Sequence, residues 1–195
     1  IYELGIQGVF TRALDAALLD HRIDVAVHSM KDVPTALAKG LIIAAVLSRG
    51  KHEDILLVKN PELFKSHDIS QKHLTIATSS IRRKAQWLNK YPSHTIVNLR
   101  GNINTRLKKL EENKWDGAIF AAAALERLEY KSSNVINLDW MVSAPSQGAI
   151  CLVCRADDLD TRTACQAINH EASSICTSIE RDFLKNMQGG CSTPI

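Results

Sequence analysis

The sequence has no cysteine before residue 151, and this absence excludes a disulfide framework running through the whole chain. All five cysteines of the 195 residues lie in the last quarter, and five is an odd number. Cysteines used in this way suit a reducing compartment. We therefore expect a cytoplasmic protein, or a plastid one if the source is a eukaryote.

Long apolar runs are also missing. None approaches the ~20 residues that span a bilayer, so we expect no membrane partner. The first residues have neither a basic flank nor a long apolar stretch, which predicts no signal peptide there. The chain starts at Ile1 rather than Met, and we expect it to be trimmed.

Strong net charge and nucleotide-binding motifs are absent as well. The net charge is only +3, and no aromatic residues are interleaved with the basic ones, so we expect no nucleic acid partner. Neither GxGxxG nor GxxxxGKS/T occurs, which excludes the common phosphate-binding loops. The one CxxC, Cys151 and Cys154, lies in an apolar run typical of a buried strand, where positions i and i+3 point to opposite faces. We therefore expect no metal site.

What the sequence does contain is an alternation of strand-like and helix-like segments, which predicts crossover units and a parallel or mixed sheet. A polar stretch at 48–54 predicts a hinge, and the loop at 143–148 predicts a return crossing between domains. The expected strands are residues 24–28, 41–47, 55–58, 74–78, 95–99, 117–121 and 149–154. The expected helices are residues 8–20, 79–90, 102–113, 122–128 and 160–187, the last broken near Asn169.

The first of these strands ends in residues suited to chemistry. Ser29, Lys31 and Asp32 follow its apolar run, and Pro34 stops the segment. In open α/β sheets the ligand crevice lies outside the carboxyl ends of the strands, so we expect Lys31 and Asp32 at the mouth of a cleft. The alternative is a surface ion pair in a loop.

Hydroxyls and arginines meet at the start of the helix expected at 79–90. Thr78, Ser79 and Ser80 supply hydroxyls, which suit the free N–H groups of a helix start. Arg82 and Arg83 follow at once, although the helix dipole places partial positive charge there. We therefore expect an anionic group to offset these arginines, and a bound carboxylate or phosphate would do so.

The next strand-to-helix turn repeats this pattern with Arg100, Gly101, Asn102, Thr105 and Arg106. Basic residues outnumber acidic ones between residues 82 and 114, which predicts a local positive field. We interpret the arginines of both turns as ligand-binding. The alternative, a solvated basic helix face, we assign to Lys108, Lys109 and Lys114.

Cys191 follows two glycines on an expected loop. Such a thiol is accessible for covalent attachment or nucleophilic attack. His28 and His170 exist as partners for a Cys–His site, but nothing in the sequence marks either as a base. We expect the other four cysteines to be packed.

Taken together, these motifs resemble the porphobilinogen deaminase (hydroxymethylbilane synthase) family over nearly the whole length of the chain. The matching motifs are FTRAL at 10–14, DVAVHSMKDVP at 24–34, TSSIRR at 78–83, LRGN at 99–102, TRL at 105–107, QGA at 147–149 and GGC at 189–191. The resemblance implies an α/β fold with two periplasmic-binding-protein-like lobes, built on mixed sheets around a cleft that holds the active site. The start of a small α+β third domain follows.

The domain bounds that the resemblance implies are residues 1–50 with about 146–160 for domain 1, which lacks its N-terminal strand and helix here. Domain 2 is expected at residues 51–145, and the truncated third domain at about 161–195. The sequence departs from the family at Ser146, where Gly is usual, and at Gln188, where Glu is usual.

The resemblance also implies an activity. Members are transferases of haem and tetrapyrrole biosynthesis that carry a dipyrromethane cofactor, joined by a thioether to the cysteine matching Cys191. They deaminate four porphobilinogen molecules, link them head to tail on that cofactor and release hydroxymethylbilane. We expect this chain to share that activity and to be a monomer.

The implied roles suit the residues. Each pyrrole carries two carboxylates, so the growing chain needs fixed cations. Asp32 is the expected catalytic acid, because a carboxylate stabilises the cationic pyrrole left by loss of ammonia. The residues expected to bind the cofactor are Ser29, Lys31, Asp32, Thr78, Ser79, Ser80, Arg82 and Arg83. Those expected to bind the substrate are Arg100, Arg106, Arg127 and Gln147.

The alternative function is a two-lobed binding module that holds a small carboxylate ligand without catalysis. It would explain the arginines and the hinge. It would not explain Asp32 beside Lys31, or Cys191 after two glycines.

Overall fold

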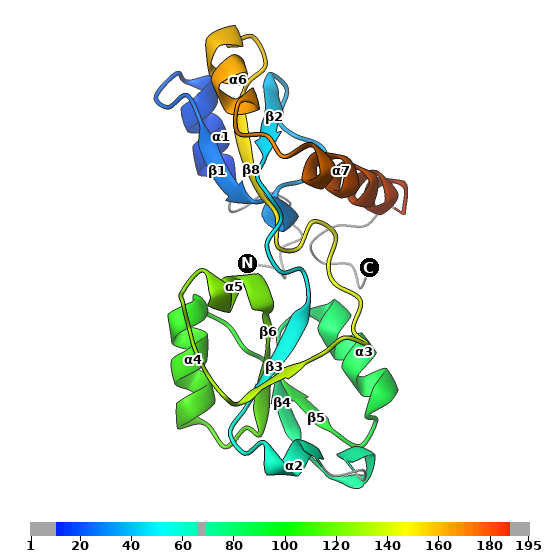
Figure 1. Ribbon diagram of the computed structural model, residues 1–195. Helices are drawn as coiled ribbons and strands as arrows, with labels where there is room; N and C mark the ends of the chain where they lie inside the picture. The colour runs from blue at the N-terminus through cyan, green and yellow to red at the C-terminus, as the bar shows by residue number, and fades with distance from the viewer. Residues whose placement is uncertain (1–10, 66–68, 188–195) are drawn as a thin grey trace. The chain divides into compact units, whose positions relative to one another are not determined.

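The computed structural model describes residues 11–65 and 69–187, and the chain divides into two compact units (Figure 1). Unit 2 is the continuous stretch Glu53–Ser143. Unit 1 is formed by the chain up to His52 and the chain from Ala144 onward. The two segments that join the units, residues 47–52 and 144–149, are called the crossing segments below.

Unit 1 is built on a three-stranded sheet in the order β1–β8–β2. The central strand β8 (Ile150–Arg155) runs antiparallel to both β1 (Ala26–Ser29) and β2 (Leu41–Val46). A register shift interrupts the β2–β8 pairing between Ile43 and Ala45. The predicted strands at 24–28, 41–47 and 149–154 are therefore confirmed.

Helices cover both faces of this sheet. Helix α1 (Arg12–Leu19) buries Leu18 on the face that carries Cys151, and α6 (Leu159–Gln166) buries Cys165 on the face that carries Cys154. The two cysteines of the CxxC thus point to opposite faces, as predicted from strand periodicity. Burial raises the pKa of the Cys151 thiol to about 11, so this cysteine behaves as a packed apolar residue. The prediction of packed cysteines is confirmed for Cys151, Cys154 and Cys165 but is wrong for Cys176, which is exposed.

The long C-terminal helix α7 (Glu171–Asn186) follows α6 after the predicted break. His170 caps it, because its Nδ1 accepts a hydrogen bond from Ser173 N at 3.2 Å. The linker before it also covers the free edge of β2: Val46 N donates to Asn169 Oδ1 at 2.9 Å, and Val46 O accepts from His170 N at 2.8 Å. An edge strand covered in this way cannot recruit another strand there.

Unit 2 is built on a five-stranded sheet, ordered β5 (Thr95–Val97), β4 (Thr75–Ala77), β6 (Gly117–Ala121), β3 (Asp54–Val58) and β7 (Val135–Asn137). Strand β4 is parallel to β5 and β6, whereas β3 is antiparallel to β6 and β7. The prediction of a mixed sheet is confirmed. The sequence pattern does not predict β7, because this strand has only three residues and two of them are exposed.

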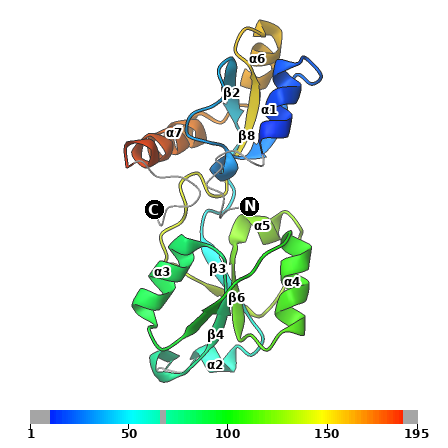
Figure 2. The same cartoon turned by 180° about the vertical axis from the view of Figure 1, so that it is seen from behind.

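The unit 2 sheet also lies between two helical layers, as Figures 1 and 2 show from opposite sides. Helix α3 (Ile81–Lys90) buries Trp87 on one face, where the short helix α2 (Glu62–Lys65) also packs through its Phe64. Helices α4 (Ile103–Glu112) and α5 (Ala122–Glu126) cover the other. The mixed α/β class expected from the sequence is therefore confirmed.

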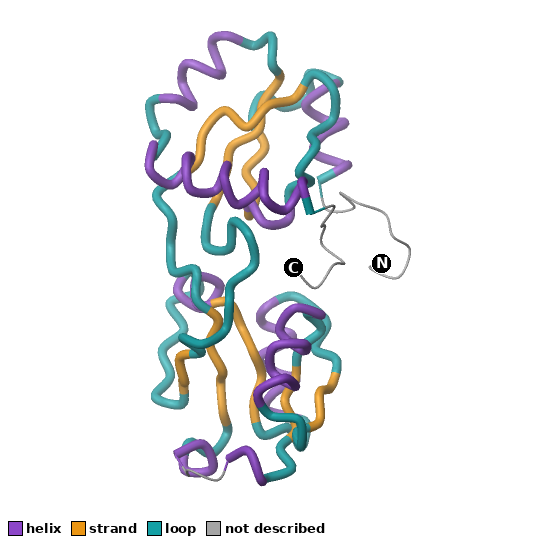
Figure 3. Tube along the Cα trace, turned by 90° about the vertical axis from the view of Figure 1, so that its right-hand side faces the viewer, coloured by secondary structure: helices purple, strands orange, loops and turns teal. Residues whose placement is uncertain are grey.

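The crossing segments are loops, drawn in teal in Figure 3, and they bond to each other. Gly50 N donates to Gly148 O at 3.2 Å. Gly148 has φ +86°, and a Cβ there would lie 2.7 Å from Lys51 O and 2.8 Å from Gly50 O. Only glycine fits this close approach of two backbones. None of the helices in the described part of the chain combines the length and the hydropathy that a membrane span requires.

Ser146, in the crossing segment at 144–149, is unfavourable for stability in two ways. Its φ is +59°, in the left-handed region that disfavours side chains other than glycine. The residue is 1% exposed, and its Oγ has no hydrogen-bond partner among the described residues. Backbone strain and an unsatisfied buried hydroxyl both favour glycine here.

We predict that Ser146→Gly raises the free energy of unfolding of unit 1 by about 1 kcal/mol, because it removes both costs. Hydrogen exchange of the β8 amides measures this, since all three tryptophans lie in unit 2. Gly148→Ala is the opposing control, and we expect it to destabilise unit 1 through the backbone clash. A Ser146→Gly variant less stable than the parent would contradict this account.

Candidate functional site

Asp32 lies on a 3₁₀ turn, Met30–Asp32, that begins where β1 ends. Met30 N donates to Ala149 O at 3.0 Å, and Val33 N donates to Met30 O at 3.1 Å. The side chains of Met30 and Val33 are 2% and 3% exposed and belong to the core of unit 1. Lys31 is exposed and Asp32 half-buried between these two anchors. The turn therefore holds Asp32 at the surface on a fixed backbone, at the carboxyl end of its strand as predicted.

The start of α3 has the cap that its sequence predicts. Ser80 Oγ accepts from Arg83 N at 3.4 Å, and Thr78 Oγ1 accepts from Ser80 N at 3.2 Å. Ser79 Oγ accepts from Leu99 N at 2.9 Å, which ties this turn to the residues that follow β5. The hydroxyls of the turn therefore order the backbone around the two arginines.

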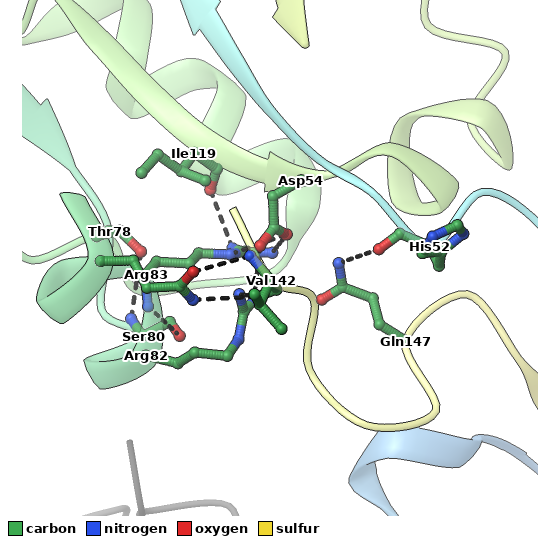
Figure 4. Close-up of polar contacts among 10 residues, drawn as sticks. His52, Asp54, Thr78, Ser80, Arg82, Arg83, Ile119, Val142 and Gln147 are labelled. Carbon is green, nitrogen blue, oxygen red and sulfur yellow. Dashed lines mark hydrogen bonds and ion pairs between the residues drawn. The ribbon is translucent and has the colours of Figure 1, made fainter. Parts of the chain in front are cut away.

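Arg82 and Arg83 converge on one carboxylate, that of Asp54 (Figure 4). Arg82 Nη2 lies 2.7 Å from Asp54 Oδ2, and Arg83 Nη2 lies 2.7 Å from Asp54 Oδ1. Arg83 also donates through Nε to Oδ1 at 3.1 Å and through Nη1 to Ile119 O at 3.1 Å. Arg82 Nη1 donates to Val142 O. We call Asp54, Arg82 and Arg83 the buried triad.

The triad is almost wholly withdrawn from solvent. Asp54 is 0% exposed, and the two arginines are 7% exposed each. Burial on its own would raise the pKa of Asp54, but the charges and hydrogen bonds of Arg83 and Arg82 outweigh burial and lower it. The carboxyl is therefore ionised at neutral pH, and the triad carries a net charge of +1.

This arrangement identifies the anion that the arginines require. The sequence predicts an anionic group opposite Arg82 and Arg83, and the structure supplies Asp54 from within the chain. The assignment of Asp54 to the hinge at 48–54 is wrong, because Asp54 is the first residue of the buried strand β3. Binding of a ligand by the two arginines stays a prediction, supported by the triad's residual positive charge.

The start of α4 is capped in the same manner as that of α3. Asn102 Oδ1 accepts from Thr105 N at 2.9 Å. Arg106, half-buried, donates through Nε to Gly101 O at 2.7 Å. Arg100 is exposed, and its carbonyl oxygen accepts from Lys109 Nζ at 3.0 Å. The start of α4 thus presents two guanidinium groups on an ordered turn.

Lys109 does not belong to the solvated face to which the sequence assigns it. The residue is half-buried, and its ammonium group holds the Arg100 carbonyl. Lys108 and Lys114 are exposed as expected, and Lys108 lies 3.6 Å from Glu112. Lys109 therefore supports the turn that carries Arg100.

Gln147 is buried in the crossing segments. Its side-chain Nε2 donates to His52 O at 2.7 Å, as Figure 4 shows, and its backbone carbonyl oxygen accepts from Arg49 Nε at 2.9 Å. Arg49 forms a two-pronged pair with Glu180 of α7, with Nη1–Oε1 2.6 Å and Nη2–Oε2 3.1 Å. The described contacts of Gln147 thus hold the two crossing segments together, and its binding of substrate stays a prediction.

The site residues predicted from the sequence are divided between the two units. Ser29, Lys31, Asp32 and Gln147 belong to unit 1; Thr78, Ser79, Ser80, Arg82, Arg83, Arg100, Arg106 and Arg127 belong to unit 2. Arg127 is exposed at the end of α5. Cys191 and Gln188 lie outside the described residues. Within the described part of the chain, no group of three or more His, Cys, Asp or Glu side chains could hold a metal ion.

The functional residue that the sequence analysis missed is Asp54. It lies 28 positions before Arg82 and follows a polar run, so local pattern assigns it to a loop. One signal was available: Asp54 directly precedes the apolar strand residues 55–58. An acid at the start of a buried strand needs a cationic partner.

A family model described as "Porphobilinogen deaminase, dipyromethane cofactor binding domain" matches residues 1–163. Among curated proteins, the porphobilinogen deaminases of Chloroherpeton thalassium and Nostoc sp. are 36% and 40% identical over 195 residues. These alignments cover 99% of this chain and 61% and 60% of the relatives. The "Porphobilinogen deaminase, chloroplastic" of Oryza sativa subsp. japonica is 38% identical, with 99% of this chain and 54% of the relative covered.

The chain thus spans about 60% of the length of the curated relatives it matches. Among solved structures, an ABC transporter periplasmic binding protein from Brucella ovis with glutathione bound aligns over 78% of this chain and 49% of its own. Its sequence identity is 14% and its TM-score 0.49. A likeness at that level carries no information about the ligand of this chain.

We predict that Asp54→Asn lowers the free energy of unfolding of unit 2 by about 3–5 kcal/mol at pH 7, because two buried guanidinium groups lose their counter-charge. Tryptophan fluorescence during urea unfolding measures this, since Trp87, Trp115 and Trp140 all lie in unit 2. The matched control is Asp116→Asn. Asp116 Oδ2 accepts only a backbone bond from Thr75 N in the described contacts, which an amide oxygen can replace.

The difference in stability between the parent and Asp54→Asn should depend on pH. The folded-state pKa of Asp54 is lowered, so its stabilising effect is present above the unfolded pKa of about 3.9 and is lost progressively as pH falls through the lower folded-state pKa. The stability difference between the parent and Asp54→Asn should therefore shrink between about pH 5 and pH 3. A difference that is constant over this range would contradict the ionised triad.

Proposed function

Because the chain belongs to the porphobilinogen deaminase family, we propose that it takes part in the deamination and head-to-tail joining of four porphobilinogen molecules, with release of hydroxymethylbilane. The observation that carries the proposal is the family match over residues 1–163, which includes the Asp32 turn and both arginine-bearing helix starts. The activity is a transferase reaction of haem and tetrapyrrole biosynthesis.

The charges of unit 2 suit such a ligand. Porphobilinogen carries an acetate and a propionate, and each added unit brings two more negative charges. The buried triad keeps a net charge of +1, and the next strand-to-helix turn, at the start of α4, adds Arg100 and Arg106. Guanidinium groups bind carboxylates through paired hydrogen bonds. We assign the Thr78–Arg83 turn to the cofactor, and Arg100, Arg106, Arg127 and Gln147 to the incoming substrate.

The Asp32 carboxylate is assigned to the reacting pyrrole. Loss of ammonia from porphobilinogen leaves an electron-poor methylene-pyrrolenine that carries positive charge. A carboxylate bonded to pyrrole N–H groups stabilises this charge and can pass protons. The fixed backbone of the Met30–Asp32 turn supports this role, because an electrostatic stabiliser acts best when it is already in place. Lys31 and Ser29 flank the carboxylate and are assigned to the cofactor's carboxylates.

The dipyrromethane group, bound through a thioether to Cys191, would supply the pyrrole carbon to which the first substrate is joined. The donors of the Thr78–Arg83 turn fit a group with several carboxylates, because hydroxyls, helix N–H groups and a net positive charge occur together there. We propose that the protein works as a cytoplasmic monomer, or in a plastid as the name of the Oryza relative suggests for that protein.

Replacing the attachment cysteine tests the covalent part of the proposal. We expect Cys191→Ser to lack the mass of the dipyrromethane, and to give no pink colour with an acidic aldehyde reagent for pyrroles. Intact-mass measurement checks the first result. The matched control is Cys176→Ser, which changes an exposed cysteine of α7 and should keep the group. Loss of the group in both variants, or in neither, would contradict the assignment.

Replacing the acid tests the catalytic part. We expect Asp32→Ala to keep the bound group and to lower porphobilinogen turnover by about 100-fold or more, the usual range for loss of a proton-transfer group. Ammonia or hydroxymethylbilane release measures turnover. Asp20→Ala, which removes an exposed partner of Arg22, should leave turnover unchanged. Full activity of Asp32→Ala would remove Asp32 from the mechanism, and a parent chain that binds carboxylates without turnover would favour a binding module.

A further inference from the structure

The carbonyl groups around the Asp32 turn are held by Arg181, a residue of α7. Arg181 Nη1 donates to Val33 O at 2.9 Å and lies 3.5 Å from Met30 O, and Nη2 donates to Pro34 O at 2.5 Å. The 3₁₀ turn ends at Asp32, so the carbonyls of Val33 and Pro34, which follow it, need donors from outside the turn. One guanidinium, 147 residues after Pro34 in the chain, supplies them.

We propose that Arg181 is a positioning residue for Asp32, which fixes the turn that carries the carboxylate without itself touching substrate. The inference rests on the proposed function, because only there does Asp32 act on a reacting pyrrole. Arg181 contacts the carbonyls of Met30 and Val33, which belong to the Met30–Lys31 and Val33–Pro34 peptide groups on either side of the Lys31–Asp32 segment. Rotation of either peptide plane would displace the Lys31–Asp32 pair, and charge-assisted bonds to carbonyls resist that rotation.

The other anchors of the turn do not perform this task. Met30 N bonds to Ala149 O, and the side chains of Met30 and Val33 fill the core. These contacts secure the two ends of the turn against the sheet. The carbonyls of Val33 and Pro34 point instead to α7, where Arg181 is the donor that the structure describes for them.

The part of α7 that carries Arg181 is fixed by contacts of its own. Its neighbour Glu180 accepts from Ser146 N at 2.6 Å and pairs with Arg49, so α7 is tied to both crossing segments at this point. The Arg181 charge also acts on Cys151 within the sheet: burial raises the pKa of that thiol, and Arg181 opposes the rise. The guanidinium therefore sits against the core of unit 1 and is not a mobile surface group.

The placement has a consequence for the proposed reaction. Helix α7 ends at Asn186, shortly before Cys191 in the sequence. The helix that leads to the proposed attachment site thus also holds the turn of the proposed acid. A misplacement of about 1 Å in such a group can reduce a rate by about 100-fold, so supporting contacts of this kind decide how well the group works.

Hydrogen exchange tests the structural part in the whole chain, whether or not it is catalytically active. In Arg181→Gln we expect the Met30 and Val33 amides to exchange about tenfold faster or more, because the turn opens locally at lower cost. Arg181→Lys keeps the positive charge and one donor nitrogen, so its exchange rates at Met30 and Val33 should lie between those of the parent and of Arg181→Gln. The matched control is Arg162→Gln on α6, which removes a guanidinium that donates to Ala156 O and should leave the Asp32 turn unchanged.

Unchanged exchange at Met30 and Val33 in Arg181→Gln would overturn the inference. Equal acceleration in Arg162→Gln would overturn it too, because the effect would then be a general loss of stability. If Arg181→Gln does not fold, the comparison of Arg181→Lys with the parent decides, with the same two amides as the readout.

Steady-state kinetics with porphobilinogen test the catalytic part. We expect Arg181→Gln to lower kcat per folded molecule by about tenfold or more, with KM within about twofold, and Arg181→Lys to recover part of the loss. A loosened turn with unchanged kcat would overturn the positioning role. A parent chain without turnover would overturn the proposed function, and with it the catalytic part of this inference, while the exchange result would still decide whether Arg181 holds the turn.

Discussion

The fold of unit 2 depends on one carboxylate. Asp54 is fully buried at the start of β3 and bonds to two guanidinium groups at the start of α3. Without it, two cations would lie in the protein interior beside the positive end of a helix, which is unfavourable on both counts. With it, Arg82 and Arg83 become structural links from α3 to β3, to Ile119 on β6 and to Val142. The positive helix start is thus stable before any ligand arrives.

Unit 1 also depends on ionised side chains, but there they bond to backbone groups instead of to other side chains. Its acid, Asp32, lies half-buried on a turn, and Arg181 donates to the Val33 and Pro34 carbonyls that follow this turn. Glu180 accepts from the backbone N–H of Ser146. Two consecutive residues of α7 thus fix two separate loops of unit 1. In unit 1 ionised side chains bond backbone groups that regular secondary structure leaves open, and in unit 2 an ionised side chain bonds two guanidinium groups. The candidate functional residues lie at these points of the fold.

Sequence pattern predicts most of the elements, because strong periodicity and helix caps are local signals. The starts of α3 and α4 were predicted with their capping residues, and the opposite facing of Cys151 and Cys154 followed from strand geometry. The partner of Arg82 and Arg83 could not be found in this way, since Asp54 is distant in sequence and belongs to another strand. The links from Arg181 to Val33 and from Asn169 to Val46 likewise arise only when the chain is folded. β7 was missed because three partly exposed residues carry too little pattern.

The ratio of one carboxylate to two guanidinium groups in the buried triad determines its net charge. A second acid beside Asp54 would neutralise the arginines and leave a structural ion cluster with no attraction for anions. No acid at all would leave two charges that the protein interior could not hold. One carboxylate for two guanidinium groups satisfies the fold and leaves one positive charge at a helix start that already favours anions. The contacts of Asp54 with Arg82 and Arg83 therefore join β3 to α3 without a ligand, and the remaining positive charge is the feature on which the proposed binding of a polycarboxylate depends.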